Sequence, residues 1–304
     1  MRLRARAAAK LNLALELLGR RPDGFHEVRS VVQCVGLYDV LEAEPAADVS
    51  VTAPAGIGPI DQNLVKLAAE ALRPFAGKGR GAALHLTKRI PAGAGLGGGS
   101  SDAASTLRLL AVLWRVPNAA TVLSSIAPRL GSDVPLFLAG PAVAVAGRGE
   151  IVEPLPALHG GWFVIVAPSW ELHQKTVQVY RAVRPSDFTS GERAALIADQ
   201  LRTGTSLDGL LLSNGLQPAV ERVFPDLARL RQDLERDTDQ RFMVTGAGPA
   251  LFAALADRAQ ATACAADARG AGRRVYVVRP LRRRTAVLRT SSSKSPRRLA
   301  ARFR

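Results

Sequence analysis

Cysteine is scarce in this 304-residue sequence, and its scarcity excludes two common ways of holding a chain together. Cys34 and Cys264 are the only cysteines, they lie far apart, and neither has a CxxC or Cys/His neighbourhood. A disulfide framework and a zinc site are therefore not expected. Because a chain of this length buries a sizeable core without them, we expect a cytoplasmic protein in a reducing compartment.

Long apolar runs are also missing. Charged residues, glycine or proline interrupt each apolar stretch before the roughly 18 residues that a membrane span requires. The N-terminus is basic, but Lys10, Asn12 and Glu16 fall where the apolar part of a signal peptide would be. We therefore expect no transmembrane helix, no secretion and no membrane partner.

Acidic residues are absent from the C-terminal segment 281–304, which contains nine of the Lys and Arg residues. Of the net charge of +15, residues 1–280 therefore carry only +6. The segment has too little apolar surface to offset its ordering entropy, which predicts a disordered basic tail. A solvated appendage and a polyanion contact both fit such a tail. No specific nucleic acid is expected, because residues 1–280 show no basic stripe with interleaved aromatics.

Strand and helix patterns are intermixed along the chain, which indicates an α+β fold. Residues 82–90 alternate like a strand, and residues 101–115 place apolar side chains at helical spacing. Two apolar runs, 162–168 and 273–279, are typical of buried strands. Residues 7–19 stay open, because their composition favours a helix whereas their alternating leucines favour a strand.

The domain organisation is predicted from where the pattern changes. Between 185 and 235 the sequence turns helical, with Gly/Ser/Thr loops, which suggests a second α+β half from about residue 156. We therefore expect an N-terminal ATP-binding domain over 1–155, a C-terminal domain over 156–280, and the basic tail over 281–304.

The strongest local feature is a glycine-dense loop between the strand at 82–90 and the helix at 101–115. Glycines tolerate positive φ and let a backbone approach a ligand closely, so successive N–H groups can converge on an anion. The helix N-terminus adds unpaired N–H groups and a positive dipole end. The loop is thus a candidate site for the phosphates of a nucleotide, with two serines able to help hold a magnesium ion. Its residues are Pro91, Ala92, Gly93, Ala94, Gly95, Leu96, Gly97, Gly98, Gly99, Ser100 and Ser101.

Two familiar nucleotide motifs are excluded. The loop lacks the Gly-Lys-Ser/Thr ending of a Walker A loop. No acidic residue for a ribose follows about 20 residues later, where a dinucleotide-binding fold would place one. A flexible linker is the alternative for any glycine run taken alone.

Three further pieces carry potential chemistry. Asp133 lies in a tight Gly131–Pro135 turn and is a candidate general base, although an Asp that only caps the turn would look the same. Lys10 is a positive charge within an apolar run, where it would either stabilise developing charge or extend to the surface. The segment 244–252 contains a second glycine turn, which alone would be a plain turn.

These stretches together resemble the superfamily of galactokinase, homoserine kinase, mevalonate kinase and phosphomevalonate kinase. Within it, the sequence is most similar to the family of kinases that act on 4-diphosphocytidyl-2-C-methyl-D-erythritol. The resemblance covers about residues 5–280, and the block with Asp-Gly-Phe-His-Glu is its discriminating part. The matching motifs are Ala9–Leu13, Arg21–Glu27, Ile90–Ala104, Gly131–Pro135 and Thr245–Pro249.

The resemblance implies a two-domain small-molecule kinase fold, with an N-terminal domain like domain 2 of ribosomal protein S5 and a C-terminal α/β sandwich. A left-handed βαβ unit would lie in the first half and the active site between the domains. ATP and Mg²⁺ would be used to phosphorylate the substrate's 2-hydroxyl, a step of the non-mevalonate isoprenoid pathway. By motif matching, Asp133 is the base and Lys10 its partner.

The resemblance also implies a substrate site. Asn12 would touch polar groups of the substrate, and His26 would read the cytosine edge. Phe25 stands where the family more often has Tyr, so a ring remains and a hydroxyl is lost. Tyr180 would stack on the other face of the cytosine. The third motif departs slightly, with Ala247 and Pro249, and the basic tail has no counterpart in the family.

Two other functions remain open on sequence grounds. A sister kinase for homoserine or mevalonate would share the loop and fold but would not need a cytidine-reading Phe-His pair. A nucleic-acid-binding protein on a kinase fold is suggested only by the tail and the isoelectric point of about 11.1. The expected partner is a small-molecule substrate, and a homodimer stays open.

Overall fold

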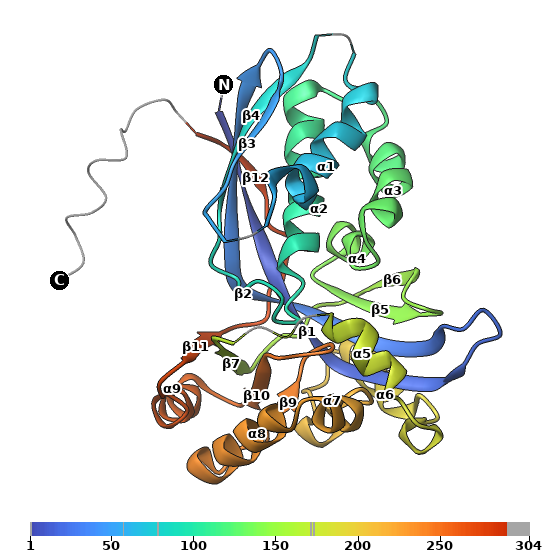
Figure 1. Ribbon diagram of the computed structural model, residues 1–304, viewed down its shortest axis with the longest axis vertical. Helices are drawn as coiled ribbons and strands as arrows, with labels where there is room; N and C mark the ends of the chain where they lie inside the picture. The colour runs from blue at the N-terminus through green and yellow to red at the C-terminus, as the bar shows by residue number, and fades with distance from the viewer. Residues whose placement is uncertain (1, 57, 78, 171, 173, 291–304) are drawn as a thin grey trace.

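The computed structural model describes residues 2–290 apart from residues 57, 78, 171 and 173. Within them, an eight-stranded sheet and a four-stranded sheet are flanked by helices (Figure 1). The predicted α+β class is confirmed. No helix among the described residues combines the length and the apolar character needed to cross a membrane.

The first sheet is built on a long antiparallel hairpin of β1 (Arg2–Arg20) and β2 (His26–Ala46). Five of its strands lie side by side in the order β12-β1-β2-β4-β3. Three shorter strands complete the sheet by pairing with β1, with β2 or with one another. The other strands are β3 (Val49–Thr52), β4 (Gly81–Thr87), β5 (Ala142–Ala146), β6 (Ile151–Leu155), β8 (Ser213–Asn214) and β12 (Val287–Thr290).

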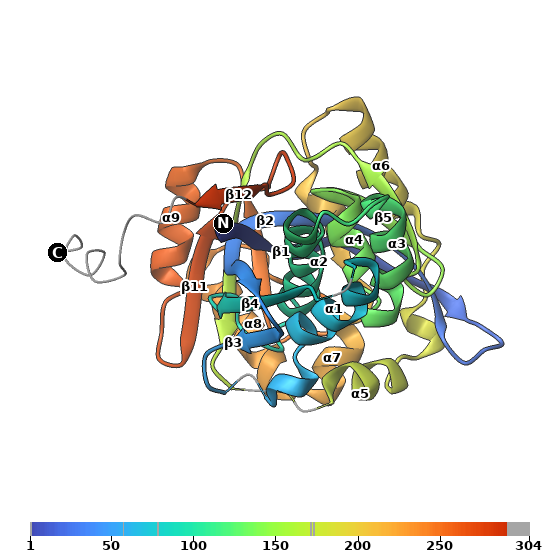
Figure 2. The ribbon, with the colours of Figure 1, turned by 90° about the horizontal axis from the view of Figure 1, so that it is seen from above.

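Helices α1 to α4 lie against one side of this sheet (Figures 1 and 2). Asn63 begins α1 by accepting a hydrogen bond from the Val65 N–H at 2.9 Å. The central helix α2 follows directly on the glycine loop and is buried along most of its length. The helices span Leu64–Leu72 (α1), Gly98–Trp114 (α2), Ala119–Leu130 (α3) and Val134–Ala139 (α4).

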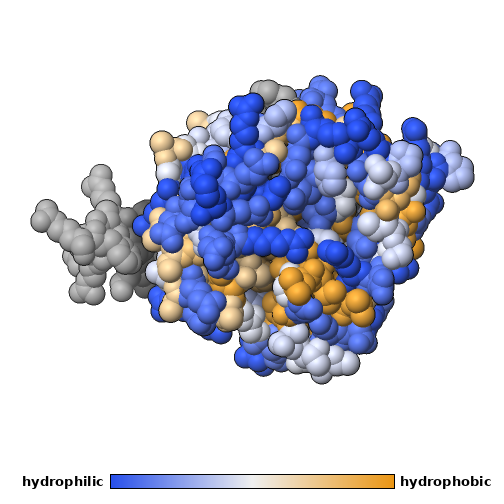
Figure 3. Space-filling view, turned by 90° about the horizontal axis from the view of Figure 1, so that it is seen from below, coloured by the Kyte–Doolittle hydropathy of each residue, from blue (hydrophilic) through white to orange (hydrophobic). Residues whose placement is uncertain are grey.

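The second sheet has the strand order β11-β7-β10-β9. Its strands are β7 (Trp162–Pro168), β9 (Met243–Val244), β10 (Leu251–Leu255) and β11 (Arg273–Val278). The remaining helices are α5 (Lys175–Arg181), α6 (Glu192–Thr203), α7 (Gln217–Val223), α8 (Pro225–Thr238) and α9 (Arg258–Asp267). Viewed from below, the surface of the molecule is mostly hydrophilic, with its main apolar patch to the lower right of the centre (Figure 3).

The segment that the sequence left open, 7–19, is part of strand β1. It is buried without interruption from Ala7 to Leu17, because the strand is covered on both faces. Leu3 packs in the core beneath α1 and α2, whereas Leu11 and Leu17 belong to the two cores around the second sheet. The strand therefore runs through all three hydrophobic clusters.

The other predicted elements are confirmed. The strand expected at 82–90 is β4, and the runs at 162–168 and 273–279 are β7 and β11. The helix expected at 101–115 is α2, which begins three residues earlier at Gly98. The helical stretch 185–235 contains α6, α7 and most of α8.

The prediction of a disordered tail from Leu281 is wrong for residues 281–290. The Leu281 N–H donates to the Cys34 carbonyl at 2.8 Å, and the Thr285 hydroxyl donates to the Arg6 carbonyl at 2.7 Å. Strand β12 then pairs antiparallel with the start of β1. Backbone groups at a sheet edge accept a strand of almost any composition, which the charge pattern could not reveal. Residues 291–304 lie outside the described residues, and the predicted boundary at 155/156 remains a prediction.

One buried amide, that of Gln33, joins several segments beside the hairpin. Its Nε2 lies 2.8 Å from the Cys34 carbonyl, 3.1 Å from that of Pro141 and 3.0 Å from that of Leu281. Its Oε1 accepts the Leu158 N–H at 2.9 Å. The side chain is fully buried, so no water replaces these bonds when they are lost.

We predict that Gln33→Leu lowers the free energy of unfolding by at least about 2 kcal/mol, because each buried backbone group left unpaired costs roughly 1–3 kcal/mol. Urea unfolding of the purified variant measures this loss. Gln232→Leu, at an exposed position on α8, is the matched control and should stay within about 0.5 kcal/mol of the wild type. Equal losses in the two variants would show that Gln33 has no special structural role.

Candidate active site

Two cavities of about 710 and 530 Å³ meet along a shared wall. The larger one is lined by the β1–β2 hairpin, by α5 and by the segment that follows α5. The smaller one is lined by the glycine loop and by the turn at 246–247. The walls that they share include Lys10, Asn12, Asp133, Thr176 and Tyr180. A ligand in one cavity would thus touch a ligand in the other beside these side chains.

The glycine loop connects β4 to α2 and adopts the backbone that its composition predicts. Gly93, Gly95 and Gly97 have φ values of 64°, 83° and 71°, a region that other residues rarely adopt. Residues 91–100 all line the smaller cavity. Ser101 does not, since it is buried and its N–H already donates to the Gly97 carbonyl at 2.9 Å. The structure therefore leaves the predicted ligand role of Ser101 without support.

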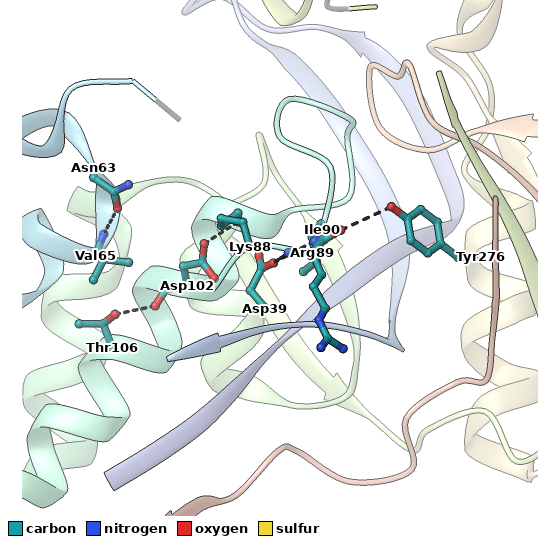
Figure 4. Close-up of polar contacts among 9 residues, drawn as sticks. All are labelled: Asp39, Asn63, Val65, Lys88, Arg89, Ile90, Asp102, Thr106 and Tyr276. Carbon is teal, nitrogen blue, oxygen red and sulfur yellow. Dashed lines mark hydrogen bonds and ion pairs between the residues drawn. The ribbon is translucent and has the colours of Figure 1, made fainter. Parts of the chain in front are cut away.

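A buried ion cluster holds the base of this loop (Figure 4). The Lys88 ammonium lies 2.5 Å from Asp39 and 2.7 Å from Asp102. Asp39 also accepts the N–H groups of Arg89 and Ile90, which fixes the exit from β4. Burial raises the pKa of Asp102 to about 7, the Lys88 charge opposes this rise, and Asp39 adds to it. The cluster ties β2, the end of β4 and the first turn of α2 together.

Lys10 extends from β1 to the meeting point of the cavities and is only 5 % exposed. Its N–H donates to the Leu96 carbonyl at 2.9 Å, and its ammonium donates to the Asn12 Oδ1 at 2.7 Å. Burial lowers the pKa of Lys10, and the negative charge of Asp133 opposes that shift. The alternative of a lysine extending to the surface is therefore wrong.

Two glycines make the space that Lys10 occupies. A Cβ at Gly97 would lie 2.9 Å from the Lys10 Cγ, and one at Gly246 would lie 3.3 Å from its Nζ. Gly246 belongs to the second glycine turn, with φ of 57°. This turn is consequently part of the site rather than a plain connection.

Asn12 holds the ammonium in place. Its Nδ2 donates to the Ser30 hydroxyl at 3.0 Å, while its Oδ1 accepts from Lys10 and, at 3.4 Å, from the Thr245 hydroxyl. The backbone N–H of Asn12 donates to the same Thr245 oxygen at 3.3 Å. Asn12 lines both cavities, so a substrate contact remains a prediction beside this positioning role.

Asp133 lies just before α4 and faces both cavities. Its side chain does not cap the helix, and the carboxylate makes no hydrogen bond within the described part of the chain. The turn-capping alternative is therefore wrong. Its charge acts on the pKa values of Lys10, Lys175 and Tyr180. An acceptor that is partly enclosed and unpaired suits a proton-transfer role.

The larger cavity has aromatic walls. The His26 ring lies 5.4 Å from that of Tyr180 and 6.1 Å from that of Phe188. Phe25 is 54 % exposed at the hairpin end, and the Arg148 guanidinium lies 5.0 Å from its ring centre. All four rings line this cavity, so the structure brings the three predicted aromatic residues together with one that was not predicted, Phe188.

The electrostatics of these rings favour neutral groups. Burial lowers the pKa of His26, and the nearby Arg20 lowers it further. Burial raises the pKa of the Tyr180 hydroxyl to about 12, and the Asp133 charge adds to this rise. A neutral imidazole offers one donor and one acceptor, which is what hydrogen bonding to a base edge requires.

Sequence reasoning missed Asn214, which positions the second glycine turn. From β8, its amide donates to the carbonyls of Val244 and Gly246 at 2.7 and 2.8 Å. Its only local signal is the Asn-Gly pair, which ordinarily indicates a turn. Lys175 and Thr176 were also not predicted as site residues, although both line the smaller cavity.

Magnesium ligands are sparse among the described residues, which contain no cluster of three or more His, Cys, Asp or Glu suited to a metal ion. Oxygen donors are nevertheless present in the smaller cavity. Ser100 and Asp133 both line it, and a Cβ at Gly131 would lie 3.9 Å from the Ser100 hydroxyl. The Ser100 hydroxyl fits a magnesium ion that takes most of its ligands from phosphate and water, as Mg²⁺ usually does.

Comparison with known proteins gives a consistent result. Residues 63–141 match the family described as the GHMP kinases N terminal domain. A 4-diphosphocytidyl-2-C-methyl-D-erythritol kinase of Dehalococcoides mccartyi is 38% identical over 277 residues, covering 90% of this chain and 97% of the relative. One of Pelotomaculum thermopropionicum is 36% identical over 286 residues, covering 92% and 98%.

Solved structures agree with these relatives. A crystal structure of 4-(cytidine 5'-diphospho)-2C-methyl-D-erythritol kinase superposes with a TM-score of 0.76 at 35% identity, covering 90% of this chain and 98% of that one. A homoserine kinase from Cytophaga hutchinsonii has a TM-score of 0.73 at 17% identity, over 94% and 97%. At this low identity, the similarity to the homoserine kinase shows a shared fold only.

The glycine positions make a further prediction. Gly97 and Gly93 share a positive φ, but only at Gly97 would a methyl meet Lys10 and, at 2.8 Å, the Phe137 ring. Gly97→Ala should therefore lose roughly 1–3 kcal/mol more unfolding free energy than Gly93→Ala, the usual cost of overpacking. Denaturant unfolding of both variants measures the difference. Similar losses would mean that backbone strain, and not the space for Lys10, requires the glycine.

Proposed function

The chain belongs to the 4-diphosphocytidyl-2-C-methyl-D-erythritol kinases, within the GHMP kinases, and from this we propose that it phosphorylates the 2-hydroxyl of 4-diphosphocytidyl-2-C-methyl-D-erythritol. The protein is an ATP-dependent kinase of isoprenoid precursor synthesis. One observation supports assigning this activity to particular residues of the chain. A cavity lined by a phosphate-type glycine loop meets a cavity with aromatic walls, and Lys10 and Asp133 lie where the two join.

Each cavity fits one ligand. The smaller one would hold ATP, with its phosphates against residues 91–100 and the N-terminus of α2. The larger one would hold the cytidine substrate between the rings of Phe25 and Tyr180, with His26 at the base edge. We assign ATP binding mainly to residues 1–155 and place the substrate between the two halves. A homodimer and a cytoplasmic location remain part of the proposal.

The transfer itself requires one proton acceptor and stabilisation of charge. The substrate's 2-hydroxyl oxygen attacks the γ-phosphorus while its proton passes to the Asp133 carboxylate. The new bond joins that oxygen to phosphorus, and the bond between phosphorus and the oxygen bridging to ADP breaks. Because the hydroxyl is tertiary and crowded, correct placement of the two ligands contributes much of the rate.

Lys10 supports the same step. Its ammonium lies beside the shared wall, held by Asn12, where it offsets charge that develops on the phosphoryl oxygens. Magnesium would neutralise phosphate charge when bound, and the Ser100 hydroxyl is the residue we propose to help hold it. Asp133 then stays available for the proton.

A sister kinase for homoserine or mevalonate fits less well. Neither molecule has a ring for a wall made of Phe25, His26, Tyr180 and Phe188. An assay of ADP release with the cytidine substrate, homoserine and mevalonate side by side tests this directly. Turnover with either of the last two, and none with the first, would contradict the proposal.

We predict that Asp133→Asn lowers kcat by at least about 100-fold, the typical loss for a general base. The affinity for ATP should stay close to that of the wild type, because the amide keeps the shape of the side chain. Steady-state kinetics and calorimetry measure the two quantities. Asp199→Asn, at an exposed position of α6 outside both cavities, is the control. Near-normal turnover of Asp133→Asn would remove this residue from the mechanism.

Tyr180→Ala should raise KM for the cytidine substrate about 5- to 150-fold, since stacking on a base is worth roughly 1–3 kcal/mol. His26→Ala should also narrow the preference for a cytosine over a uracil head group, because a site that hydrogen-bonds a group rejects analogues lacking it. Kinetics with both head groups measure these effects, with Tyr276→Ala, outside the cavity, as control. An unchanged cytosine-to-uracil ratio in His26→Ala would favour a merely structural histidine.

A further inference from the structure

Lys175 is a second lysine in the nucleotide cavity, and neither the motifs nor the mechanism above uses it. It is the first residue of α5, the helix that also carries Tyr180. Its side chain lines the smaller cavity together with the glycine loop, Gly246 and Ala247. Its ammonium donates a hydrogen bond to the Gly248 carbonyl in the second glycine turn. An ammonium has three donors, so this bond leaves two for a ligand.

The surroundings of Lys175 favour an anion. Burial and the charge of Lys10 lower the pKa of Lys175 to about 8, and Asp133 opposes this shift. Within the described residues, neither Lys10 nor Lys175 has a carboxylate within ion-pair distance. Two ammonium groups sharing one partly buried cavity repel each other, and an anionic ligand between them would relieve that repulsion.

Apart from Asp133, the other charged groups near this cavity within the described part of the chain are already paired. Lys88, on its wall, is bound to Asp39 and Asp102. Helix α7 packs against α5 and carries Glu221 and Arg222, which pair with Arg231 and Asp187 respectively. Among the residues that the structure describes, Asp133 is the unpaired carboxylate whose charge acts on Lys175. The cationic side of the cavity is therefore left to Lys10 and Lys175.

We propose that Lys175 contacts the γ-phosphoryl group of ATP from α5 and stabilises it, together with Lys10, during transfer to the substrate. The inference rests on the proposed function and names a further residue of the same site. Because α5 also carries Tyr180, the contact links the position of the phosphate to that of the substrate wall. A point charge of this kind stabilises the transferring group and the departing ADP without any covalent step.

If Lys175 contacts the phosphate, ATP binding and the protonation of the Lys175 ammonium must be coupled. Above pH 8 the ammonium of the free protein loses its proton, so the phosphate loses a partner and kcat/KM for ATP should fall as the pH rises from 7 to 9. ATP binding favours the charged form and raises the pKa of Lys175. At pH 8, where about half of these groups are neutral, binding should therefore take up roughly half a proton per site.

The test uses the full chain, with Lys175→Met, Lys175→Arg and the wild type. Steady-state kinetics at pH 7 and 9 are combined with calorimetry of a non-hydrolysable ATP analogue at pH 8, in two buffers of different ionisation enthalpy. Lys175→Met should lower kcat about 100-fold and abolish proton uptake, as expected for losing one charge at the transferring group. Lys175→Arg should keep most of the activity and lose the fall between pH 7 and 9, because arginine stays charged.

Two results would overturn the inference. One is wild-type binding without proton uptake at pH 8, which stays decisive even where Lys175→Met fails to fold. The other is a Lys175→Met protein with a lower melting temperature but unchanged kcat, which would mean that the residue only pins the Gly248 turn. Failure of the proposed function looks different, since the wild type itself would then release no ADP with the cytidine substrate.

Discussion

The burial of the Lys10 ammonium is the constraint on which the rest of the site depends. Removing a charge from water is costly unless hydrogen bonds and opposite charge compensate, and here Asn12 and Asp133 provide them. The same side chain needs space, which is why Gly97 and Gly246 approach it without a Cβ. Two loops far apart in the sequence are thus brought to one lysine.

The frame that makes this burial feasible is the hairpin shared by both halves. Strand β1 passes through all three cores, and the later segments β8 and β12 return to pair with it. Beside this hairpin, the Gln33 amide forms hydrogen bonds that connect β2 to the segments around Leu158 and Leu281. A site beside this hairpin can therefore contain residues from both halves of the chain, while strand β1 fixes their relative positions.

Much of the site could be predicted from local chemistry. Asp133, Lys10, the glycine loop and the Phe25-His26 pair each carry a signal in residue type and spacing, and the structure gathers them around two cavities that meet. Asn214 and Lys175 could not be found in this way. Each acts through a hydrogen bond to a turn distant in sequence, and an isolated Asn or Lys resembles many solvent-exposed residues. Ser101 is buried because helix geometry, and not residue type, turns it into the core, so its predicted ligand role stays a prediction without structural support.

By itself, the sequence determined the succession of strand, positive-φ glycine loop and helix at β4 and α2, the buried strands β7 and β11, and the family, because these depend on neighbouring residues and on periodicity. It left residues 7–19 undecided and misjudged 281–290, since burial on both faces hides alternation and edge pairing uses the backbone alone. Only the tertiary structure decided which charges stand unpaired. The pKa values of Lys10 and Lys175 depend on burial and on Asp133, and both arise from contacts between segments that meet only in the folded chain.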